Sequence, residues 1–325
     1  MPRIANASLI LTVLNEATAL PAFFESVQAQ TVLPADIVVV DGGSVDGTAR
    51  MFAEWELPSG VEVTVVVSNG ANISKGRNIA FSSAKHERVL VTDAGTSLSP
   101  KWAEQMLEGF ERVGSPAVIC GFFEPVGEAL TERTIAFTVT PRVEEIDGQT
   151  FLPSSRSLAT TRQAWQDAGG YPEWLDYCED LLFDLELKRL GKQFEFVPEA
   201  RVTWSARPTL AAFMKQYFRY ARGDGKASLW AKRHVARYAA YAVGLVVLGF
   251  CFVQPLLLIL LAAGGFLYLR KFWRRLWRGR EEFGSGFAAG IALVPVVVVA
   301  GDLAKMAGYP AGLLWKRKHR ASAHQ

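Results

Sequence analysis

Apolar strand-like runs alternate with helix-like segments from Ser8 to Asp93, and this alternation limits the possible folds more than any other feature of the chain. The strand-like runs are almost continuously apolar, which is typical of a parallel sheet covered by helices on both faces. Repeated strand–helix units join through right-handed crossovers and build a doubly wound α/β sheet. The expected strands are residues 8–14, 36–40, 61–67 and 87–93, and the expected helices are residues 18–30, 48–56 and 74–84.

The stretch VVVDGGSVDGT, residues 38–48, places Asp41 where the second expected strand ends. Ligands bind such sheets at the carboxyl ends of the strands, and Asp93 ends the fourth strand at the same edge. Glycines after a strand let the backbone approach a ligand closely, and a carboxylate there accepts hydrogen bonds from a base or ribose. We therefore expect Asp41 to contact a ligand, and Ser44 or Asp46 to cap the next helix. The G-x-G-x-x-G dinucleotide fingerprint does not follow the first strand.

Charge divides the chain into two unlike parts. Residues 1–200 hold 15 Lys and Arg against 28 Asp and Glu, whereas residues 201–325 hold 20 against 4. This asymmetry favours a soluble acidic domain followed by a basic, apolar tail over one uniform globule. Long apolar runs among the basic residues also argue against nucleic acid as the partner of the tail.

Two apolar stretches, residues 238–269 and 283–314, are separated by the basic linker RKFWRRLWRGREE. Their length and basic flanks predict membrane association, with the linker and the terminal KRKHR on the cytoplasmic side. Gln254-Pro255 is expected to break the first stretch, and Gly301-Asp302 and Lys305 interrupt the second. The number of crossings stays open: hairpins, or one span with an interfacial helix, both fit the pattern.

Several stretches between residues 8 and 200, in this order, resemble the family 2 glycosyltransferases: TVLNE, VVVDGGSVDGT, GRNIA, VLVTDAGTSLSPKW, GGYPEW and EDLLFDLELKRLG. The resemblance implies the GT-A fold, an α/β nucleotide-sugar-binding domain with a mainly parallel sheet, here followed by C-terminal membrane helices. The expected organisation is a catalytic domain at residues 1–206, an amphipathic interfacial region at 207–237 and membrane-associated helices at 238–325.

The same resemblance assigns the donor pocket. The aspartate that matches Asp41 contacts the base in this family, and residues that match Thr12, Leu14 and Glu16 line the same pocket. The arginine that matches Arg77 lies near the nucleotide.

The family's metal motif, D-x-D, appears here as Asp93-Ala94-Gly95, so its second acid is missing. Asp93 is still expected to bind Mg²⁺ or Mn²⁺ as a hard oxygen ligand, with diphosphate oxygens and water completing the coordination.

Cys178-Glu179-Asp180 matches the family's E-D motif at the start of a helix. An inverting sugar transfer needs a base that takes the acceptor's hydroxyl proton. By resemblance Asp180 is that base and Glu179 supports it. Acidic residues at a helix N-terminus also stabilise the helix dipole, which is the structural alternative for this pair.

Acceptor-side residues are the least specific predictions. Arg156 lies in a stretch that matches the place of the family's acceptor-side loop, where it would meet a phosphate or a sugar; a solvated surface arginine explains the residue equally well. Gln216, Arg219 and Tyr220 resemble the Q-x-x-R-W element of membrane polysaccharide synthases, with tyrosine in place of tryptophan. An amphipathic helix that lies in the lipid headgroups explains the same segment equally well.

These features predict a membrane-anchored, metal-dependent inverting glycosyltransferase that works on the cytoplasmic face. It would move a sugar from a nucleotide-sugar donor to a hydroxyl acceptor in polysaccharide, lipid-linked oligosaccharide or glycolipid synthesis. The alternatives are a polyprenyl-phosphate sugar transferase and a non-catalytic nucleotide-sugar-binding membrane subunit. The acceptor would accordingly be a membrane lipid, a lipid-linked sugar or a glycan.

Overall fold

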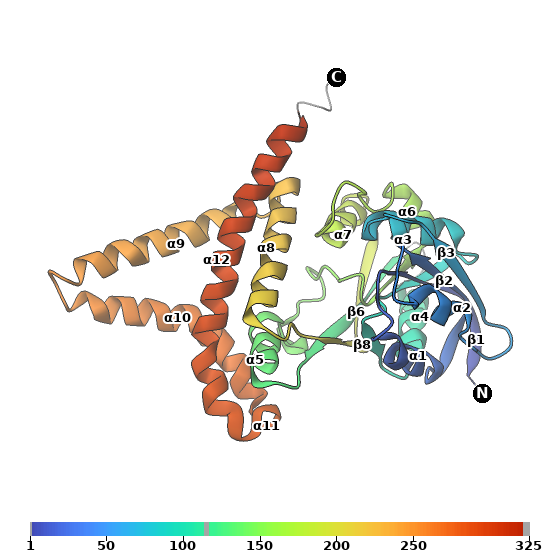
Figure 1. Cartoon of the computed structure of the whole chain (residues 1–325), viewed down its shortest axis with the longest axis horizontal. Helices are drawn as coiled ribbons and strands as arrows, with labels where there is room; N and C mark the ends of the chain where they lie inside the picture. Colours follow the sequence, from blue (N-terminus) through green and yellow to red (C-terminus); the bar gives the residue numbers. More distant parts are fainter. Residues whose placement is uncertain (1, 114–116, 321–325) are drawn as a thin grey trace. The chain divides into compact units, whose positions relative to one another are not determined.

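The computed structural model describes residues 2–113 and 117–320, which form two compact units (Figure 1). The first unit contains Met1–Glu124 and Val143–Ser205, and the second contains Pro125–Arg142 and Ala206–Gln325. The segment Pro125–Arg142, which lies inside the predicted range 1–206, thus belongs with the C-terminal helices. The reason is its helix α5 (Leu130–Val139), whose Ile135 and Ala136 are buried in a cluster with apolar residues of the C-terminal helices.

An eight-stranded sheet forms the first unit, in the order β3-β2-β1-β4-β7-β6-β8-β5. The four strands on the β3 side are parallel, as the alternating pattern predicted. β7 is antiparallel to β4 and β6, and β5 is antiparallel to β8, so the sheet is mixed. The strands are β1 (Arg3–Val13), β2 (Val32–Asp41), β3 (Glu62–Val67), β4 (Arg88–Val91), β5 (Thr96–Leu98), β6 (Ala117–Val126), β7 (Leu158–Thr161) and β8 (Gln193–Ser205).

Helices cover both faces of this sheet. Successive residues of a strand point to opposite faces, so β1 contributes side chains to both buried layers. Leu9 and Leu11 of β1 pack in one buried cluster with residues of α1, α2 and α4. Ile10 of the same strand packs in a second cluster with residues of α3, α6 and α7. These helices are α1 (Leu20–Gln28), α2 (Thr48–Ala53), α3 (Ile73–Ser83), α4 (Trp102–Val113), α6 (Arg162–Asp167) and α7 (Glu179–Arg189).

Strand register brings the predicted donor residues to one edge of the sheet. Asp41, the last residue of β2, pairs with Val13 of β1. Val91, the last residue of β4, pairs with Ile10 on the other side of β1, so Asp93 emerges at the level of Thr12. The carboxyl ends of parallel strands meet there, as expected for a ligand site in an α/β sheet.

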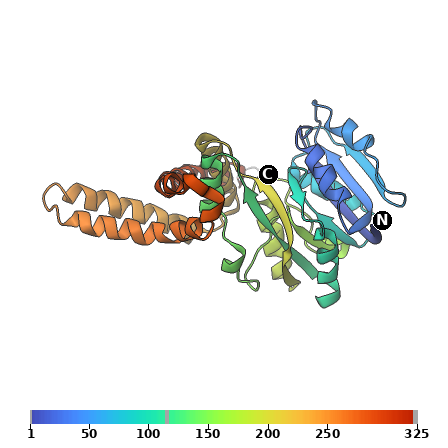
Figure 2. The same cartoon turned by 90° about the horizontal axis from the view of Figure 1, so that it is seen from below.

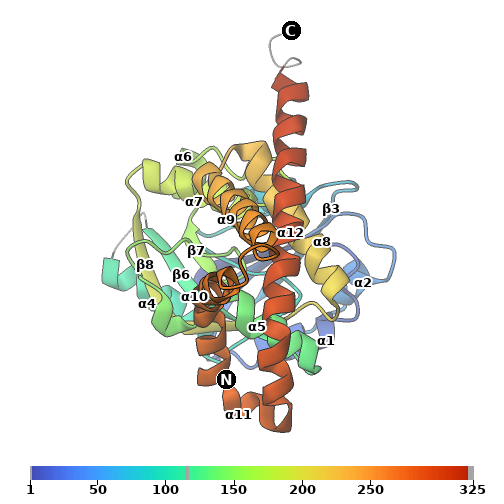
Figure 3. The same cartoon turned by 90° about the vertical axis from the view of Figure 1, so that its left-hand side faces the viewer.

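The second unit is helical, and its central feature is the close pair of α8 and α12 (Figure 3). Glycines allow this approach: a Cβ on Gly308 would lie 2.2 Å from the carbonyl oxygen of Phe218, and one on Gly312 would lie 2.2 Å from that of Arg222. The helices after α5 are α8 (Leu210–Ala227), α9 (Ala231–Phe250), α10 (Leu257–Arg278), α11 (Arg280–Phe283) and α12 (Phe287–Arg320). Short 3₁₀ turns lie at Val143–Glu145 in the first unit and Gly284–Gly286 in the second.

The two apolar stretches fold differently. The predicted break at Gln254-Pro255 is confirmed: α9 ends at Phe250, α10 begins at Leu257, and the two form a hairpin (Figure 2). In the second stretch, α12 runs without a break from Phe287 through Gly301-Asp302 and Lys305, so these interruptions of the apolar pattern do not end the helix. Over the described part of the chain, one helical segment, Arg280–His319, is long and apolar enough to cross a membrane.

Candidate active site

The loops after β1 and β2 are tied to each other by hydrogen bonds. Asn15, in the left-handed conformation with φ 57°, donates from its backbone N–H to Ser44 Oγ at 2.8 Å. Asp46 accepts from the backbone N–H groups of Ala17 and Thr48 at 3.0 and 3.1 Å. Gly47 is the N-cap residue of α2, so Asp46 bonds the first helical amide from outside the helix and joins the two loops. These hydrogen bonds hold the two loops together at the edge of the sheet where the donor is predicted to bind.

Asp41 is fully buried at the end of β2. Its Oδ1 accepts from the backbone N–H groups of Gly43 and Ser44 at 2.7 and 2.6 Å. Gly43 has φ 105°, and a Cβ there would lie 2.9 Å from Asn69 Oδ1, so the turn requires glycine. The other oxygen, Oδ2, is buried and has no hydrogen-bond partner among the described residues. A buried acceptor without a partner is costly, and a donor group on a ligand would satisfy it.

We expect Asp41→Asn to weaken nucleotide binding without loss of fold. Asparagine keeps an oxygen for the Gly43 and Ser44 amides but replaces the unpartnered acceptor with an N–H donor. A lost buried hydrogen bond costs about 1–3 kcal/mol, or roughly fivefold to a hundredfold in affinity. Isothermal titration with the nucleotide measures this loss. Unchanged affinity in Asp41→Asn, together with an unfolded Asp41→Ala, would show that Asp41 only shapes the turn.

Thr12, Leu14 and Glu16 lie along β1 and the loop that follows it. Thr12 is half-buried beneath α3, because a Cβ on Gly76 would lie only 2.7 Å from Thr12 Cγ2. Leu14 is exposed, and its Cδ1 lies 3.7 Å from the Cβ position of Gly42 in the DGG turn. Glu16 donates its backbone N–H to Thr48 Oγ1 at 2.9 Å. These three residues therefore lie at the same edge of the sheet as Asp41, and their role in donor binding stays a prediction.

Arg77 lies in α3, one residue after the glycine that brings this helix against β1. Its side chain is 3% exposed. Nη1 donates to Glu179 Oε1 at 2.7 Å, and Nη2 donates to Asp93 Oδ1 at 3.0 Å. The guanidinium also lies 5.3 Å from the centre of the Tyr171 ring, within cation–π range. Arg77 thus joins the predicted metal residue to the predicted acidic pair through Nη1 and Nη2, whereas its buried Nε has no hydrogen-bond partner among the described residues.

Glu179 and Asp180 begin helix α7, and the two carboxylates have different surroundings. Glu179 is buried against Arg77, whereas Asp180 is half-buried and lies 3.4 Å from Ser154 Oγ. Cys178 before them has φ 66°, a left-handed conformation that is strained for residues other than glycine. Strained backbone of this kind is often found at functional sites. The polypeptide therefore presents Asp180 at the helix N-terminus and keeps Glu179 inside.

Burial raises the pKa of two acids of α7, Glu179 and Asp184. Burial raises the pKa of Glu179, the charge of Asp180 raises it further, and the Arg77 guanidinium opposes both. Burial also raises the pKa of Asp184 well above its ordinary value, with a further contribution from Asp180. Of the two acids that begin α7, Asp180 is thus the more accessible one.

Arg156 lies beside Asp93 at the end of the LPSSRS loop. Its Nε is 3.6 Å from Asp93 Oδ2, and its Nη1 donates to Ser154 Oγ at 3.2 Å. The guanidinium lies over the Trp204 ring, 4.8 Å from its centre, which fixes its direction. Ser154 consequently contacts both Arg156 and Asp180, so the predicted acceptor-side residue and the predicted base lie in one cluster.

Gly95 occupies the position of the missing D-x-D acid, and Glu16 lies next to it. A Cβ on Gly95 would have Glu16 Oε2 as its nearest atom, at 3.9 Å. A carboxylate from the β1–α1 loop thus stands beside the place of the absent side chain. No group of three His, Cys, Asp or Glu within residues 2–113 and 117–320 is arranged to hold a metal. Asp93 and Glu16 carry carboxylate oxygens of the kind that a hard cation takes alongside diphosphate and water oxygens, and Asp93 also contacts Arg77 and Arg156.

Asn78 of α3 was not predicted, although it lies inside the quoted GRNIA motif. Its Nδ2 donates to the carbonyl of Tyr171 at 2.9 Å, and its Oδ1 accepts from the Tyr171 N–H at 2.7 Å. Ser74 of the same helix donates to the carbonyl of Leu175 at 3.2 Å. These bonds hold the GGYPEW loop, which leads into the acidic pair of α7. Ser154 and Tyr171 likewise received no predicted role, although Tyr171 lies in the GGYPEW motif and Ser154 lies two residues before Arg156.

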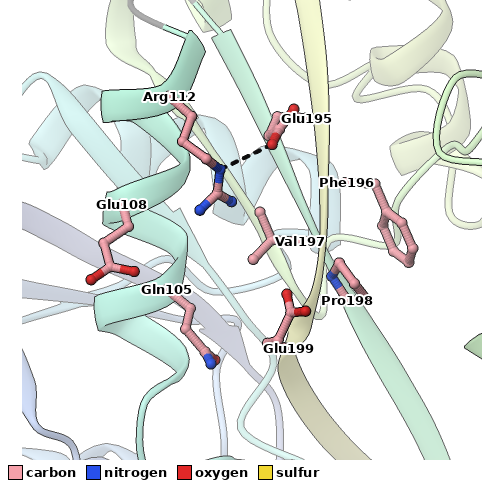
Figure 4. A pocket seen from close by; sticks show the side chains of 8 residues that line it. All are labelled: Gln105, Glu108, Arg112, Glu195, Phe196, Val197, Pro198 and Glu199. Atoms are coloured by element: carbon pink, nitrogen blue, oxygen red, sulfur yellow. Dashed lines mark hydrogen bonds and ion pairs between the residues drawn. The ribbon is translucent and has the colours of Figure 1, made fainter.

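Gln216, Arg219 and Tyr220 lie on α8 of the second unit, where the buried Gln216 donates to Tyr220 Oη at 2.8 Å. Their acceptor role stays a prediction. On the first unit, a hollow between α4 and β8 contains none of the predicted site residues (Figure 4). Arg112 and Glu195, which pair at 3.0 Å, form part of its wall.

Comparison with known families agrees with this arrangement. The family described as Glycosyl transferase family 2 matches residues 8–160, and Glycosyl transferase family group 2 matches residues 88–301. The second match covers more than half of the chain. The chain therefore belongs to the family 2 glycosyltransferases.

Individual relatives are distant. The chain is 23% identical over 229 residues to the succinoglycan biosynthesis protein ExoA of Rhizobium meliloti (strain 1021), covering 67% of this chain and 68% of that protein. It is 20% identical over 231 residues to the O-antigen chain rhamnosyltransferase RfbN of Salmonella typhimurium, covering 65% and 70%. A shorter match of 28% over 120 residues covers 34% of this chain and 37% of an undecaprenyl-phosphate 4-deoxy-4-formamido-L-arabinose transferase of Serratia proteamaculans (strain 568).

Solved structures confirm the GT-A fold. The mannosyltransferase PcManGT from Pyrobaculum calidifontis, in complex with GDP-Man and Mn²⁺, aligns with a TM-score of 0.55 at 17% identity, covering 96% of this chain and 88% of that one. S. aureus TarS 1-349 in complex with UDP-GlcNAc aligns with a TM-score of 0.51 at 15% identity, covering 98% and 92%.

Proposed function

We propose that this protein is a membrane-anchored inverting glycosyltransferase of cell-envelope polysaccharide, lipid-linked oligosaccharide or glycolipid assembly. It moves a sugar from a nucleotide-sugar donor to an acceptor hydroxyl, with its catalytic unit on the cytoplasmic face. The observation that carries the proposal is the cluster in which Arg77 holds Asp93 and Glu179 while Asp180 stays accessible beside Ser154. Relatives named for succinoglycan and O-antigen assembly support the acceptor class.

The donor end of the site is the edge formed by β1, β2 and β4. The unpartnered Oδ2 of Asp41 accepts a hydrogen bond from the base, while Thr12 and Leu14 line the pocket. The diphosphate lies toward Asp93 and Arg156. Asp93 and Glu16 would hold Mg²⁺ or Mn²⁺, which supplies positive charge to the leaving diphosphate when bound. The complex of a neighbour with GDP-Man and Mn²⁺ supports this use of a metal.

Asp180 is the proposed base. The acceptor oxygen attacks the anomeric carbon of the sugar, and the bond from that carbon to the diphosphate oxygen breaks. The acceptor's proton passes to the Asp180 carboxylate, and the nucleoside diphosphate leaves with the electron pair of the broken bond. Glu179 is buried against Arg77 and contributes by fixing the start of α7 rather than by taking the proton.

A second candidate is transfer to a polyprenyl phosphate. Arg156 supports it, because a guanidinium that contacts Ser154 next to Asp180 suits an anionic acceptor. The partial likeness to an undecaprenyl-phosphate sugar transferase points the same way. A phosphate acceptor is already ionised, so this reaction has little need of a base.

Turnover of UDP-, GDP- and dTDP-sugars with Mn²⁺ and after EDTA tests the proposed function. We expect one donor to be turned over and Mn²⁺ to raise its affinity. Glu16→Gln should lose most of that increase, because it removes one of the two carboxylates beside the diphosphate. Glu25→Gln, the same change on the exposed surface of α1, is the matched control and should behave as wild type. Failure to turn over any donor would favour the non-catalytic binding subunit. Equal donor affinity with and without Mn²⁺ would contradict the proposed role of the metal in donor binding.

A further inference from the structure

We infer that the hairpin of α9 and α10 is a re-entrant membrane element. Residues 238–269 form its apolar part, the apolar hairpin. The apolar hairpin enters an anionic lipid bilayer and returns on the same face without crossing. This goes beyond membrane association, because it names the inserting segment, its depth and its lipid partner.

Exposed apolar side chains cover the apolar hairpin. Phe252 is 90% exposed and Val253 is 84% exposed at its tip, and Leu245 of α9 is 68% exposed. An apolar surface of this length exceeds what soluble proteins leave in water and marks an interaction site. The two helices lie side by side and project from the α8–α12 pair (Figures 1 and 2). The exposed large residues that make up this surface are Val243, Leu245, Val246, Leu248, Phe250, Phe252, Val253, Leu256, Leu258, Ile259, Leu260, Phe266 and Leu267.

Charge and aromatic residues identify a lipid bilayer as the partner. From Ala231 to Arg278 the sequence contains no acidic residue, and its basic residues lie at the two ends of the hairpin and nowhere within the apolar part. Tyr241, Tyr268 and Trp273 lie near the same ends, where aromatic rings sit in a headgroup layer. Basic clusters of this kind attract anionic lipids. The cations are Lys232, Arg233 and Arg237 on the α9 side, and Arg270, Lys271, Arg274, Arg275 and Arg278 on the α10 side.

The tip suits a hydrocarbon environment because it leaves few backbone donors unsatisfied. The N–H groups of Cys251 through Gln254 bond to carbonyls of residues 247–250, and those of Leu257 through Ile259 bond to carbonyls of residues 254–256. Pro255 has no N–H. Backbone groups that are bonded internally enter lipid at far lower cost than groups that lose water without a partner.

The arms are too short to cross. The arm of α9 from Tyr238 to Phe250 is about 20 Å long at 1.5 Å per residue, and the α10 arm from Leu257 to Leu269 is the same. The hydrocarbon core is about 30 Å thick. At the root, Asp302 of α12 accepts from Arg237 Nε at 2.8 Å and from the hydroxyls of Tyr241 and Tyr268, which fixes both arms to α12. This ion pair marks the depth at which the hairpin stops.

The segment that contains α12 is long and apolar enough to cross a membrane, but the packing of α12 on α8 argues against it as the inserting segment. Phe213 of α8 approaches Gly301 of α12, and further along Arg222 approaches Gly312. That part of α12 therefore enters hydrocarbon only if α8 goes with it. Charged residues in hydrocarbon are costly, and α8 carries five along its length: Lys215, Arg219, Arg222, Asp224 and Lys226.

Flotation with vesicles of phosphatidylcholine and phosphatidylglycerol tests the assignment to the hairpin. Phe252→Asp and Val253→Asp should each weaken binding of the full chain by about fiftyfold or more, because a carboxylate deep in a bilayer is strongly disfavoured. Val299→Asp, at a 42% exposed position of α12, is the matched control and should bind as wild type. Loss of binding in Val299→Asp alone would move the assignment to α12. A dimer in lipid-free solution that Phe252→Asp dissociates would show that a second copy covers the hairpin.

Depth is tested in reconstituted proteoliposomes with an impermeant maleimide applied to either side. Gln254→Cys is introduced together with Cys178→Ser and Cys251→Ser, and Lys232→Cys in the same background is the reference. We expect Lys232→Cys to be labelled from one side and Gln254→Cys from neither until detergent is added. Labelling of Gln254→Cys from the opposite side would show a full crossing, and labelling from the same side as Lys232→Cys would show no insertion. Either result overturns the inference.

Discussion

Asp180→Asn is expected to lower turnover on a hydroxyl acceptor by at least about a hundredfold, because a general base typically contributes ~10²–10⁴-fold. Donor affinity should stay within a few-fold of wild type, because the proposed donor contacts belong to Asp41, Asp93 and Glu16. A lower kcat at an unchanged affinity is the signature of an interaction made in the transition state. Isothermal titration with the nucleotide and a transfer assay on the same preparation measure the two quantities.

The neighbouring Asp176 provides the control for this experiment. It lies exposed in the loop before α7, so Asp176→Asn makes the same chemical change a short distance from the proposed base. It should leave turnover close to that of wild type. Near-normal transfer by Asp180→Asn would disprove the base assignment, and the polyprenyl-phosphate acceptor would become the better interpretation because it needs no proton removal.

Local sequence pattern was sufficient to predict that Asp41 and Asp93 lie at one edge of the sheet. Asp41 and Asp93 follow apolar runs, and parallel strands that are covered on both faces bring their carboxyl ends together whatever the rest of the chain does. The antiparallel half of the sheet was not predicted. β7 and β6 lie outside the regular strand–helix repeat, and the chain between them passes through α5, which packs in the second unit.

The pairing of Arg77 with Glu179 was beyond sequence reasoning. The two residues are 102 positions apart, and neither carries a signal that names its partner. The place of Arg77 near the nucleotide, which the resemblance implies, stays a prediction; the structure shows its 3% exposed side chain paired with two carboxylates. The role of Asn78 was not predicted for a related reason: its partners are backbone groups of a loop that is distant in sequence. Long-range polar contacts of this kind depend on the completed fold.

Loss of Arg77 should also lower the stability of the fold strongly. Arg77→Met leaves the buried Glu179 carboxylate without its partner, and breaking one side of a buried pair typically costs about 3–5 kcal/mol of unfolding free energy. Arg77→Lys should recover only part of this loss of stability. Its ammonium keeps the positive charge but cannot donate to Glu179 and Asp93 in the geometry of the guanidinium fork. Denaturant unfolding, followed by tryptophan fluorescence, measures the change. Arg189→Met, which breaks the exposed pair with Glu186, is the control and should change stability little.

The double variant Arg77→Met with Glu179→Met separates stability from catalysis. Removing both partners of a buried ion pair leaves no uncompensated charge, so the double variant should be more stable than Arg77→Met alone. Turnover should nevertheless stay low, because the buried link from Asp93 through Arg77 to the start of α7 is then lost, and only the longer contacts through Arg156 and Ser154 connect Asp93 to Asp180. If the double variant is no more stable than Arg77→Met, the buried pair is not the reason for the loss. If it regains wild-type turnover, Arg77 does not position the base.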